Sequence, residues 1–422
     1  MLTVLTEPTI ILPPSKSAAN RALVLAFLSM GIDGTERVWK GISQYPRPLP
    51  DDIHLMYEAL KTLAASHSPS AAPILQVGAA GTVLRFLLPI VALHRTEPVR
   101  FAGSCRLFQR PLTPLLKALA RAGASWQTEV DGGLLMPPKL VPDNLEFDID
   151  GSMSSQFISG LAMSVAGLPR GGIIRWKSGV ASRHYLHLTK LWLERFGCQT
   201  SLNDNSIEIQ GGLKHKTQKD EEQTEICGDW SAAAVVFCAA AILEKELEAG
   251  PLDDADGQPD AAILKLLKTV GCSWRFDGLR CTFTGRLNGA IDADLFDCPD
   301  LAPPLAALAV FAPEVSCLRG LDTLPHKESD RLLGIEKLVE WLGGRTELLS
   351  STSLKIYPLQ AVTSHKSQLA EEPFDPMDDH RLAFAAAIGA LKTGGTILNL
   401  ECVNKSWPTF NTKLHPNGSN LD

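Results

Sequence analysis

Basic and hydroxyl side chains gather where apolar helices are expected to begin. Lys16 and Arg21 lie in the stretch Ser-Lys-Ser-Ala-Ala-Asn-Arg, which follows two prolines, and Ser15 is suited to cap the helix. Lys16 and Asn20 are four residues apart, as are Ser17 and Arg21, so the two pairs form adjacent stripes on one face. Free backbone N–H groups and the positive end of the helix dipole reinforce these cations. The first cluster therefore predicts a site for a phosphate or a carboxylate.

Comparable polar clusters recur along the chain. Each of them taken singly is explained more simply as a helix cap or an ion pair, and Ser154-Ser155-Gln156 has the composition of a capping box. Their repetition at one structural position favours anion binding over coincidence. The clusters begin at or near Ser15, Gly78, Gly151, Gly228, Asp297 and Asp378.

The elements that must position these clusters form a repeated pattern. Each cluster precedes an Ala/Leu-rich run that is apolar nearly all round, which predicts a buried core helix, and the runs recur every roughly 60–80 residues. Amphipathic helices that end in Gly are expected within 110–123, 182–197, 259–271 and 327–344, and strands within 133–141, 206–213 and 281–287. Six such units in two groups of three predict an α/β chain with two similar domains. The most polar segment, 215–224, is expected to be a loop near their boundary.

Composition narrows the classes of protein that fit. The chain has 422 residues, of which 45% are hydrophobic and 21% charged, so it can bury a large core and is not globally disordered. The net charge of −7 disfavours a nucleic-acid binder, and we find no run long and apolar enough to span a membrane. The nine cysteines are scattered without a CxxC motif, which disfavours zinc and favours reduced thiols in the cytoplasm.

The motifs, taken in order, resemble one family. LPPSKSAANRAL is similar to the opening pattern LPGSKS-x-x-NRAL of the 5-enolpyruvylshikimate-3-phosphate synthase family. GAAGTVLRFL, CRLFQRPLTPLLKAL, DGSMSSQFISGLAM, SRHYL, GDWSAAA, KESDRL, DDHRLAFA and NKSWPTF follow in the family's order over nearly the whole chain. The resemblance implies two domains, each of three βαβαββ units around a pseudo-threefold axis, as in the inside-out α/β barrel of the enolpyruvyl transferases. It divides the chain into 12–226, and 1–11 plus 227–422, with the active site in the cleft between them.

The resemblance also implies the reaction. Phosphoenolpyruvate would transfer its enolpyruvyl group to the 5-hydroxyl of 3-phosphoshikimate through a tetrahedral intermediate, with release of phosphate, in the biosynthesis of chorismate and aromatic amino acids. It implies no metal and no organic cofactor, and a cytoplasmic monomer whose partners are these two small molecules, with no nucleic acid and no membrane.

Site residues carry over from the resemblance position by position. Catalytic roles are implied for Asp300, Glu328, Lys16, His380 and Lys405, with Asp300 accepting the hydroxyl proton, Glu328 acting near the methylene and Asp52 in support. The residues implied for 3-phosphoshikimate are Lys16, Ser17, Arg21, Ser154, Ser155, Gln156, Ser182, Tyr185, Asp300, Thr323 and Lys327. Those implied for phosphoenolpyruvate are Lys16, Gly81, Arg110, Gln156, Arg331, Arg381 and Lys405.

Some positions depart from the family pattern. Many members have Gly, Asn, Pro and Asn at the positions where this chain has Pro14, Ala79, Phe86 and Thr323, while the charged residues are kept.

Two alternatives stay open: the related UDP-N-acetylglucosamine enolpyruvyl transferase, and a paralogue that binds an anionic metabolite without turnover. The Lys16-Ser17 start disfavours the first, because that relative carries Lys-Asn. Retention of Lys16, Asp300, Glu328 and Lys405 disfavours the second.

Overall fold

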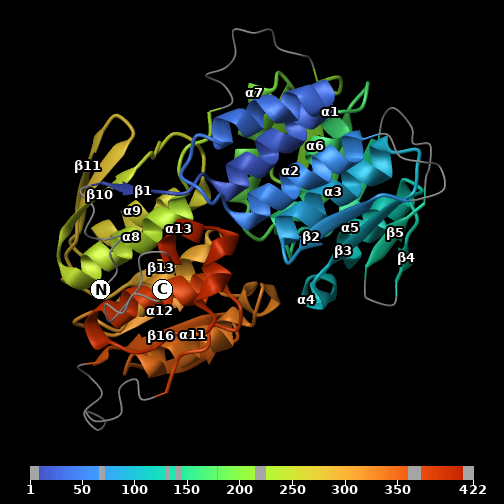
Figure 1. The fold of residues 1–422 in the computed structure, drawn as a ribbon. Coiled ribbons are helices and arrows are strands. Elements are labelled where there is room, and N and C mark those ends of the chain that lie inside the picture. Colours follow the sequence, from blue (N-terminus) through green and yellow to red (C-terminus); the bar gives the residue numbers. More distant parts are fainter. Residues whose placement is uncertain are drawn as a thin grey trace, which may run out of the picture. The chain divides into compact units, whose positions relative to one another are not determined.

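The computed structural model divides the chain into two compact units (Figure 1). It describes residues 9–65, 72–129, 133–137, 145–177, 179–213, 225–359 and 372–411. The N-terminal unit comprises Ser15–Tyr45 and Asp51–Ile226, and the C-terminal unit comprises Met1–Pro14, Pro46–Pro50 and Cys227–Asp422. The chain thus enters the C-terminal unit at both of its ends. The predicted loop 215–224 lies outside the described residues.

The α/β class is confirmed, because each unit alternates helices with short strands. The N-terminal unit contains α1 (Lys16–Ile42), α2 (Asp51–Ala64), β2 (Ile74–Gly78), α3 (Gly81–His94), β3 (Val99–Gly103), α4 (Cys105–Gln109), α5 (Thr113–Arg121), β4 (Gln127–Thr128), β5 (Leu134–Met136), β6 (Leu145–Ile149), α6 (Ser155–Ala166), β7 (Gly172–Trp176), α7 (His184–Arg195), β8 (Thr200–Leu202) and β9 (Ser206–Ile209).

The C-terminal unit has the same kind of alternation, with several short 3-10 helices (η). It contains β1 (Ile10–Ile11), α8 (Trp230–Leu243), β10 (Glu246–Gly250), η3 (Pro259–Ala261), α9 (Ala262–Lys268), β11 (Ser273–Asp277), β12 (Arg280–Thr284), β13 (Asp292–Asp294), η4 (Pro299–Leu301), α10 (Ala302–Ala309), β14 (Ser316–Arg319), η5 (Leu324–His326), α11 (Arg331–Trp341), β15 (Arg345–Ser350), β16 (Ser353–Tyr357), α12 (His380–Thr393), η7 (Leu400–Lys405) and α13 (Pro408–Asn411).

One sheet topology occurs four times. The sheets have the orders β2-β3-β5-β4, β6-β7-β9-β8, β1-β10-β12-β11 and β13-β14-β16-β15. In every sheet the first two strands are parallel and the other neighbours are antiparallel. A helix joins the parallel strands and an amphipathic helix leads to the closing hairpin, which is the βαβαββ order except where β1 comes from the distant N-terminal segment.

The six predicted core helices are all present and buried. They are α1, α3 and α6 in the N-terminal unit, and α8, α10 and α12 in the C-terminal unit, where each set of three packs pairwise. In α8, twelve of the fourteen residues are buried, which agrees with a sequence that is apolar all round. Figure 1 shows α8 and α12 in the C-terminal unit, where α8 packs on β10 and β12 and α10 packs on β14 and β16. Each sheet therefore has one face covered by a core helix.

The units that begin at α1 and α12 differ from the predicted pattern. In the described residues neither has a four-stranded sheet of its own; α1 continues through a kink at Gly31 to Ile42 and is followed by α2, and α12 has only a bridge between Phe374 and Ile397. The physical reason is the spacing of Val38 and Ile42, which are both buried and four residues apart, a helical and not an alternating pattern. No helix in the described part of the chain is long and apolar enough to cross a membrane.

Candidate active site

The first core helix of the N-terminal unit begins with a fixed lysine. Ser15 caps α1 by accepting a hydrogen bond from the backbone N–H of Ala18 at 3.3 Å. Lys16 Nζ lies 3.0 Å from a carboxylate oxygen of Asp52, which is buried in the first turn of α2. Asp52 therefore holds the Lys16 ammonium at the helix start.

Gln156 joins the starts of α6 and α3. Its amide Nε2 donates to Thr82 Oγ1 at 3.2 Å, and its Oε1 accepts from Arg85 Nη1 at 2.8 Å. Thr82 and Arg85 both belong to α3, one and four residues after Gly81, so two helix starts are tied together through one amide. Because both amide atoms are already held, the orientation of Gln156 is fixed before any ligand binds.

Arg110 lies against the first residue of α3. A Cβ added at Gly81 would stand 2.8 Å from Arg110 Nη1, so the close approach of this guanidinium requires glycine there. Arg110 and Arg85 are both buried, and Arg85 donates to the carbonyl of Pro111 at 3.2 Å. Burial, and then the positive charge of Arg110, lower the pKa of Arg85 well below its usual value. Two like charges held in a buried setting favour an anionic ligand that would relieve their repulsion.

Arg21 is buried among three helices. It donates to Thr189 Oγ1, Ser159 Oγ and the carbonyls of Ser17 and Tyr185, at 2.8–3.4 Å. Burial lowers the pKa of Arg21 to about 10, partly offset by Tyr185. These contacts tie α1, α6 and α7 together and fix the backbone at Tyr185, so within this unit Arg21 has a structural role whatever it does for a ligand.

The remaining N-terminal positions are also at helix starts. Ser154 caps α6 through the backbone N–H of Gln156 at 3.3 Å, and Ser155 is buried as the first residue of that helix. Ser182 has a left-handed backbone, with φ of 58°, just before α7. A serine rarely adopts this conformation, and such residues cluster at functional sites.

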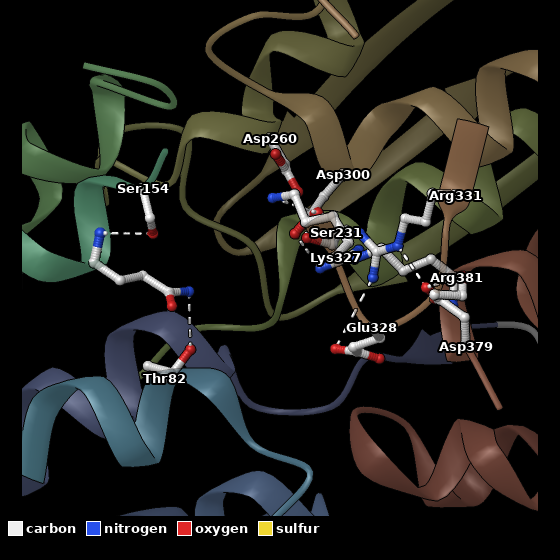
Figure 2. A network of polar contacts seen from close by, with 12 residues as sticks. Thr82, Ser154, Ser231, Asp260, Asp300, Lys327, Glu328, Arg331, Asp379 and Arg381 are labelled. Atoms are coloured by element: carbon white, nitrogen blue, oxygen red, sulfur yellow. Dashed lines mark hydrogen bonds and ion pairs between the residues drawn. The ribbon is translucent and has the colours of Figure 1, made fainter. Parts of the chain in front are cut away.

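In the C-terminal unit, Asp300 is surrounded by cations. Its carboxylate lies 2.7 Å from Arg331 Nη1, 2.8 Å from Arg381 Nη2 and 3.7 Å from Lys327 Nζ. Asp300 sits in η4, just before α10, whereas Arg331 and Arg381 open α11 and α12. The starts of three helices therefore converge on one carboxylate (Figure 2).

Glu328 forms a second centre. Its Oε1 lies 3.0 Å from Lys405 Nζ and 3.9 Å from Arg331 Nη2, and its Oε2 lies 2.9 Å from His380 Nδ1. Burial alone would raise the pKa of Glu328, but His380, Lys405 and Arg331 outweigh it and hold the pKa well below its usual value. These cations therefore favour the ionised form of the Glu328 carboxylate.

Asp379 fixes the arginine that the two centres share. It is fully buried, caps α12 through the N–H of Arg381 at 3.0 Å, and accepts from Ser329 Oγ at 3.1 Å and Arg331 Nε at 2.7 Å. Burial would raise the pKa of Asp379, but Arg331 and then His380 keep it below its usual value. Burial alone would lower the pKa of Arg331, but the carboxylates of Asp379, Asp300 and Glu328 raise it above its usual value.

The structure brings the predicted residues together within each unit. In the C-terminal unit Asp300, Lys327, Glu328, Arg331, His380, Arg381 and Lys405 form one network of ion pairs. Thr323 stands four residues before Lys327 in the sequence. It is buried, and its Oγ1 has no hydrogen-bond partner in the described part of the chain. In the N-terminal unit Gly81, Arg110 and Gln156 meet at the start of α3.

Four participants are absent from the predicted site. Arg85, Thr82, Asp379 and Asp260 all contact or electrostatically influence predicted residues. Arg85 carried a signal, since an arginine inside an apolar helix is unusual enough to single out, whereas Asp379 stands where an aspartate is common as a helix cap. Asp260 carried none, because it precedes a different helix and meets the network only in three dimensions.

One group of side chains in the C-terminal unit has a spacing compatible with a metal ion. Its possible ligand atoms lie within 4.8 Å of one another, on Glu328, Asp379 and His380. The carboxylates of this group already contact Arg331 and Lys405, and His380 Nδ1 faces Glu328. Three side chains that are neutralised by two cations make a poor cation site. The donor set fits an anion-binding cluster better than a metal centre.

Comparison with known proteins identifies sequences and structures that this chain resembles. The chain is 31% identical to the 3-phosphoshikimate 1-carboxyvinyltransferase of Syntrophobacter fumaroxidans, over 94% of each chain, and 31% identical to that of Methanoculleus marisnigri, over 96% of each. Its fold is similar to EPSP synthase from Acinetobacter baumannii, with a TM-score of 0.67 at 21% identity over 96% of this chain and 94% of that one. It is also similar to the enolpyruvyl transferase NikO from Streptomyces tendae, with a TM-score of 0.65 at 15% identity over 97% and 94%.

These two relatives carry the same enzyme name, and the two solved structures have a similar fold. The sequence model of one family matches residues 6–414, nearly the whole chain. The polar clusters at the helix starts lie within this matched region. The chain therefore belongs to the EPSP synthase (3-phosphoshikimate 1-carboxyvinyltransferase) family.

Proposed function

We propose that this protein transfers the enolpyruvyl group of phosphoenolpyruvate to the 5-hydroxyl of 3-phosphoshikimate and releases phosphate. Family membership along residues 6–414 supports the reaction. The single observation that carries the proposal to this chain is the C-terminal ion-pair network. It holds two carboxylates, Asp300 and Glu328, in separate settings, each against cations that suit polyanionic substrates.

The chemistry needs two proton transfers in opposite directions. The methylene carbon of phosphoenolpyruvate must gain a proton, while the attacking hydroxyl must lose one as the new C–O bond forms. The tetrahedral intermediate then loses phosphate and a proton from its methyl group, which restores the double bond. We assign the hydroxyl proton to Asp300 and the proton at the methylene to Glu328, with Lys405 and His380 in contact with Glu328.

The low pKa of Glu328 limits when this residue can act as a proton donor. An ionised Glu328 cannot donate a proton, so a substrate must first weaken the hold of its cations. A phosphoenolpyruvate anion that attracts Lys405 and Arg331 does this, because each cation then divides its field between Glu328 and the ligand. Substrate binding thereby raises the proton affinity of Glu328 at the moment when the proton is needed.

The N-terminal cluster supplies the remaining binding groups in this proposal. Lys16, Gly81, Arg110 and Gln156 would bind phosphoenolpyruvate, and the hydroxyls of Ser154, Ser155 and Ser182 would bind 3-phosphoshikimate, with Tyr185 and Lys327 beside it. Support comes from the fixed amide of Gln156 and from the facing guanidinium of Arg110. Preorganised donors of this kind bind anions without reorganisation cost.

We also propose that the enzyme is a cytoplasmic monomer. All nine cysteines are free thiols, and burial raises the pKa of several of them, including Cys198 to about 11. Such thiols suit a reducing compartment. The mass in solution, measured by light scattering, tests the monomer.

The function is tested by phosphate release from phosphoenolpyruvate with defined acceptors. We expect release with 3-phosphoshikimate and none with UDP-N-acetylglucosamine or with phosphoenolpyruvate alone. Release only with the UDP-sugar would assign the chain to the related transferase activity. Tight binding of 3-phosphoshikimate without release would instead identify a binding protein that has lost turnover.

A further inference from the structure

A buried carboxyl group outside the assigned site lies within reach of its charges. Asp260 is 2% exposed and sits in η3, before α9. Its Oδ2 accepts a hydrogen bond from the hydroxyl of Ser231, the second residue of α8. Its Oδ1 is buried with no hydrogen-bond partner in the part of the chain that the structure describes. A buried ionised carboxylate with an unsatisfied oxygen is costly, so this environment favours the protonated form.

The position of Asp260 is fixed by the segment that precedes it. Gln258 accepts from the backbone N–H of Trp230 at 3.1 Å and donates to the carbonyl of Gly228 at 2.9 Å. Gln258 also contacts the Asp256 carboxylate at 2.5 Å. These bonds attach the Asp256–Asp260 segment to the first turn of α8, so Asp260 cannot move out to solvent without breaking them.

The charged groups that face Asp260 come from several elements. Burial and the negative charge of Asp300 raise the pKa of Asp260 to about 6, with Arg381 and Ser231 opposing this rise and Asp229 adding to it. The same carboxyl contributes to raising the pKa of the Cys298 thiol, after burial. The surrounding titratable or charged groups are Asp229 before α8, Asp256 in the attached segment, Cys298 and Asp300 at η4, and Arg381 in α12. Figure 2 shows the hydrogen-bonded pair of Asp260 and Ser231 in the same view as Asp300 and Arg381.

We propose that Asp260 is a positioning residue whose proton affinity rises when an anion binds at Arg331 and Arg381, so that binding is accompanied by partial uptake of a proton from solvent. The negative charge of ionised Asp260 weakens the attraction between Arg381 and an anionic ligand, whereas neutral Asp260 does not weaken it. An anion at these arginines in turn adds negative charge near Asp260 and increases its proton affinity. Ser231 is half-buried, so its hydroxyl connects Asp260 to the more open side. No bond other than the O–H bond of the carboxyl group is formed.

This inference rests on the proposed function only in treating Arg331 and Arg381 as anion-binding residues. Sulfate is a suitable probe, because it carries no titrating proton near neutral pH. By linkage, we expect the sulfate dissociation constant of the wild-type protein to rise roughly three- to tenfold from about pH 5 to about pH 7.5 at constant ionic strength. Asp260→Asn should abolish this dependence, leaving a change of less than about twofold.

Two further variants keep the experiment decisive. Asp277→Asn, at an exposed position of β11, is the matched control and should show the wild-type dependence. Ser231→Ala removes a hydrogen bond that lowers the pKa of Asp260, so it should move the change in affinity to higher pH. It also provides the test if Asp260→Asn does not fold. Calorimetry in buffers of different ionisation enthalpy should detect proton uptake with sulfate in the wild type and little in Asp260→Asn.

The inference is overturned if Asp260→Asn keeps the wild-type pH dependence, because another group would then bind the proton. It is also overturned if the affinity of the wild type does not change with pH, or if Ser231→Ala leaves the wild-type profile unmoved. A protein that shows the sulfate effect but releases no phosphate from the two substrates would contradict the proposed function and leave this inference standing.

Discussion

At the scale of residues, three buried carboxyl groups in one unit differ in the direction of their pKa shifts for identifiable reasons. Glu328 and Asp379 are buried, yet cations in contact with them keep their pKa values below the usual range. Asp300 contacts three cations directly, whereas Asp260 accepts a hydrogen bond from the Ser231 hydroxyl, and burial and Asp300 raise its pKa to about 6. Direct contact with a cation decides the outcome, because burial is common to Glu328, Asp379 and Asp260.

Glu328→Gln should reduce turnover at least about 100-fold, because the amide can neither give nor take the proton at the methylene. The affinity for 3-phosphoshikimate should change far less, since Gln keeps the shape and can still accept hydrogen bonds from Lys405. Steady-state kinetics with a separate binding measurement separates the two effects. Asp300→Ala should likewise lose turnover far more than this affinity.

The control for Glu328→Gln is Glu340→Gln, at an exposed position of α11 in the same unit. It should have wild-type kinetics. A Glu328→Gln enzyme with near wild-type turnover would contradict the role given to Glu328.

Asp260→Asn should stabilise the protein above about pH 6 and have little effect near pH 4. The folded-state pKa of Asp260 is raised, so the folded protein binds more protons than the unfolded chain between about pH 4 and about pH 6. Wild-type stability therefore decreases as the pH rises through that window, and the amide escapes this loss. The gain should be at most about 3 kcal/mol, measured by denaturant unfolding at both pH values. Equal gains at both pH values would show that protonation is not the cause.

The cations of the site could be predicted from sequence, and several of their partners could not. Lys16, Arg331 and Arg381 stand in local clusters at helix starts, which spacing alone reveals. The contact of Ser231 with Asp260 joins residues 29 positions apart, and that of Arg85 with Gln156 joins residues 71 apart. Such pairings depend on how helices pack, and periodicity gives no information about them.

At the scale of elements, one device is repeated. Four of the six core helices begin with a capping Ser or Asp, and side chains that we propose to bind ligands occupy the first turn, as with Ser15 on α1, Ser154 on α6 and Asp379 on α12, whereas α3 and α10 have no side-chain cap. The cap satisfies one free N–H group and leaves others for an anion. Packing three such helices together in each unit concentrates these starts in space.

Gly81→Ala should weaken phosphoenolpyruvate binding and leave folding nearly unchanged. The new Cβ would lie 2.8 Å from Arg110 Nη1, and the end of that flexible side chain must move. Displacing a guanidinium from an anion loses a charge-assisted hydrogen bond, so the KM for phosphoenolpyruvate should rise about tenfold. The affinity for 3-phosphoshikimate should be retained.

Gly41→Ala is the matched control, because a Cβ there meets nothing within 4 Å in the last turn of α1. It should leave the KM at the wild-type value. An unchanged KM in Gly81→Ala would mean that Arg110 does not contact phosphoenolpyruvate.

The core helices were predictable because burial on all sides leaves a continuous apolar run, as in α8. The missing sheet after α1 was not predicted. There the chain continues as a helix beyond Gly31, and Trp39 stacks on Tyr57 of α2 at 3.9 Å between ring centroids. Within 32–50 the helical spacing of Val38 and Ile42 is only a short signal, and packing against a neighbouring helix completes the structure.

At the scale of the whole molecule, net charge and ligand charge have opposite signs. The chain carries a net charge of −7, yet its motifs place lysines and arginines at helix starts in both units. Many of the surplus acids lie in exposed strands and loops, for example Asp292 and Glu347. Total charge therefore disfavours a nucleic-acid partner but does not identify a small anionic substrate.

The most direct test of the account is the reaction run in D2O with phosphoenolpyruvate and 3-phosphoshikimate, followed by proton NMR of the product. Addition and elimination pass through a methyl group formed with a solvent-derived proton, so the enolpyruvyl ether should carry deuterium in its methylene group. Formation of that ether together with phosphate, with deuterium incorporated, is the predicted result. An ether with no deuterium, or no ether at all, would contradict the account.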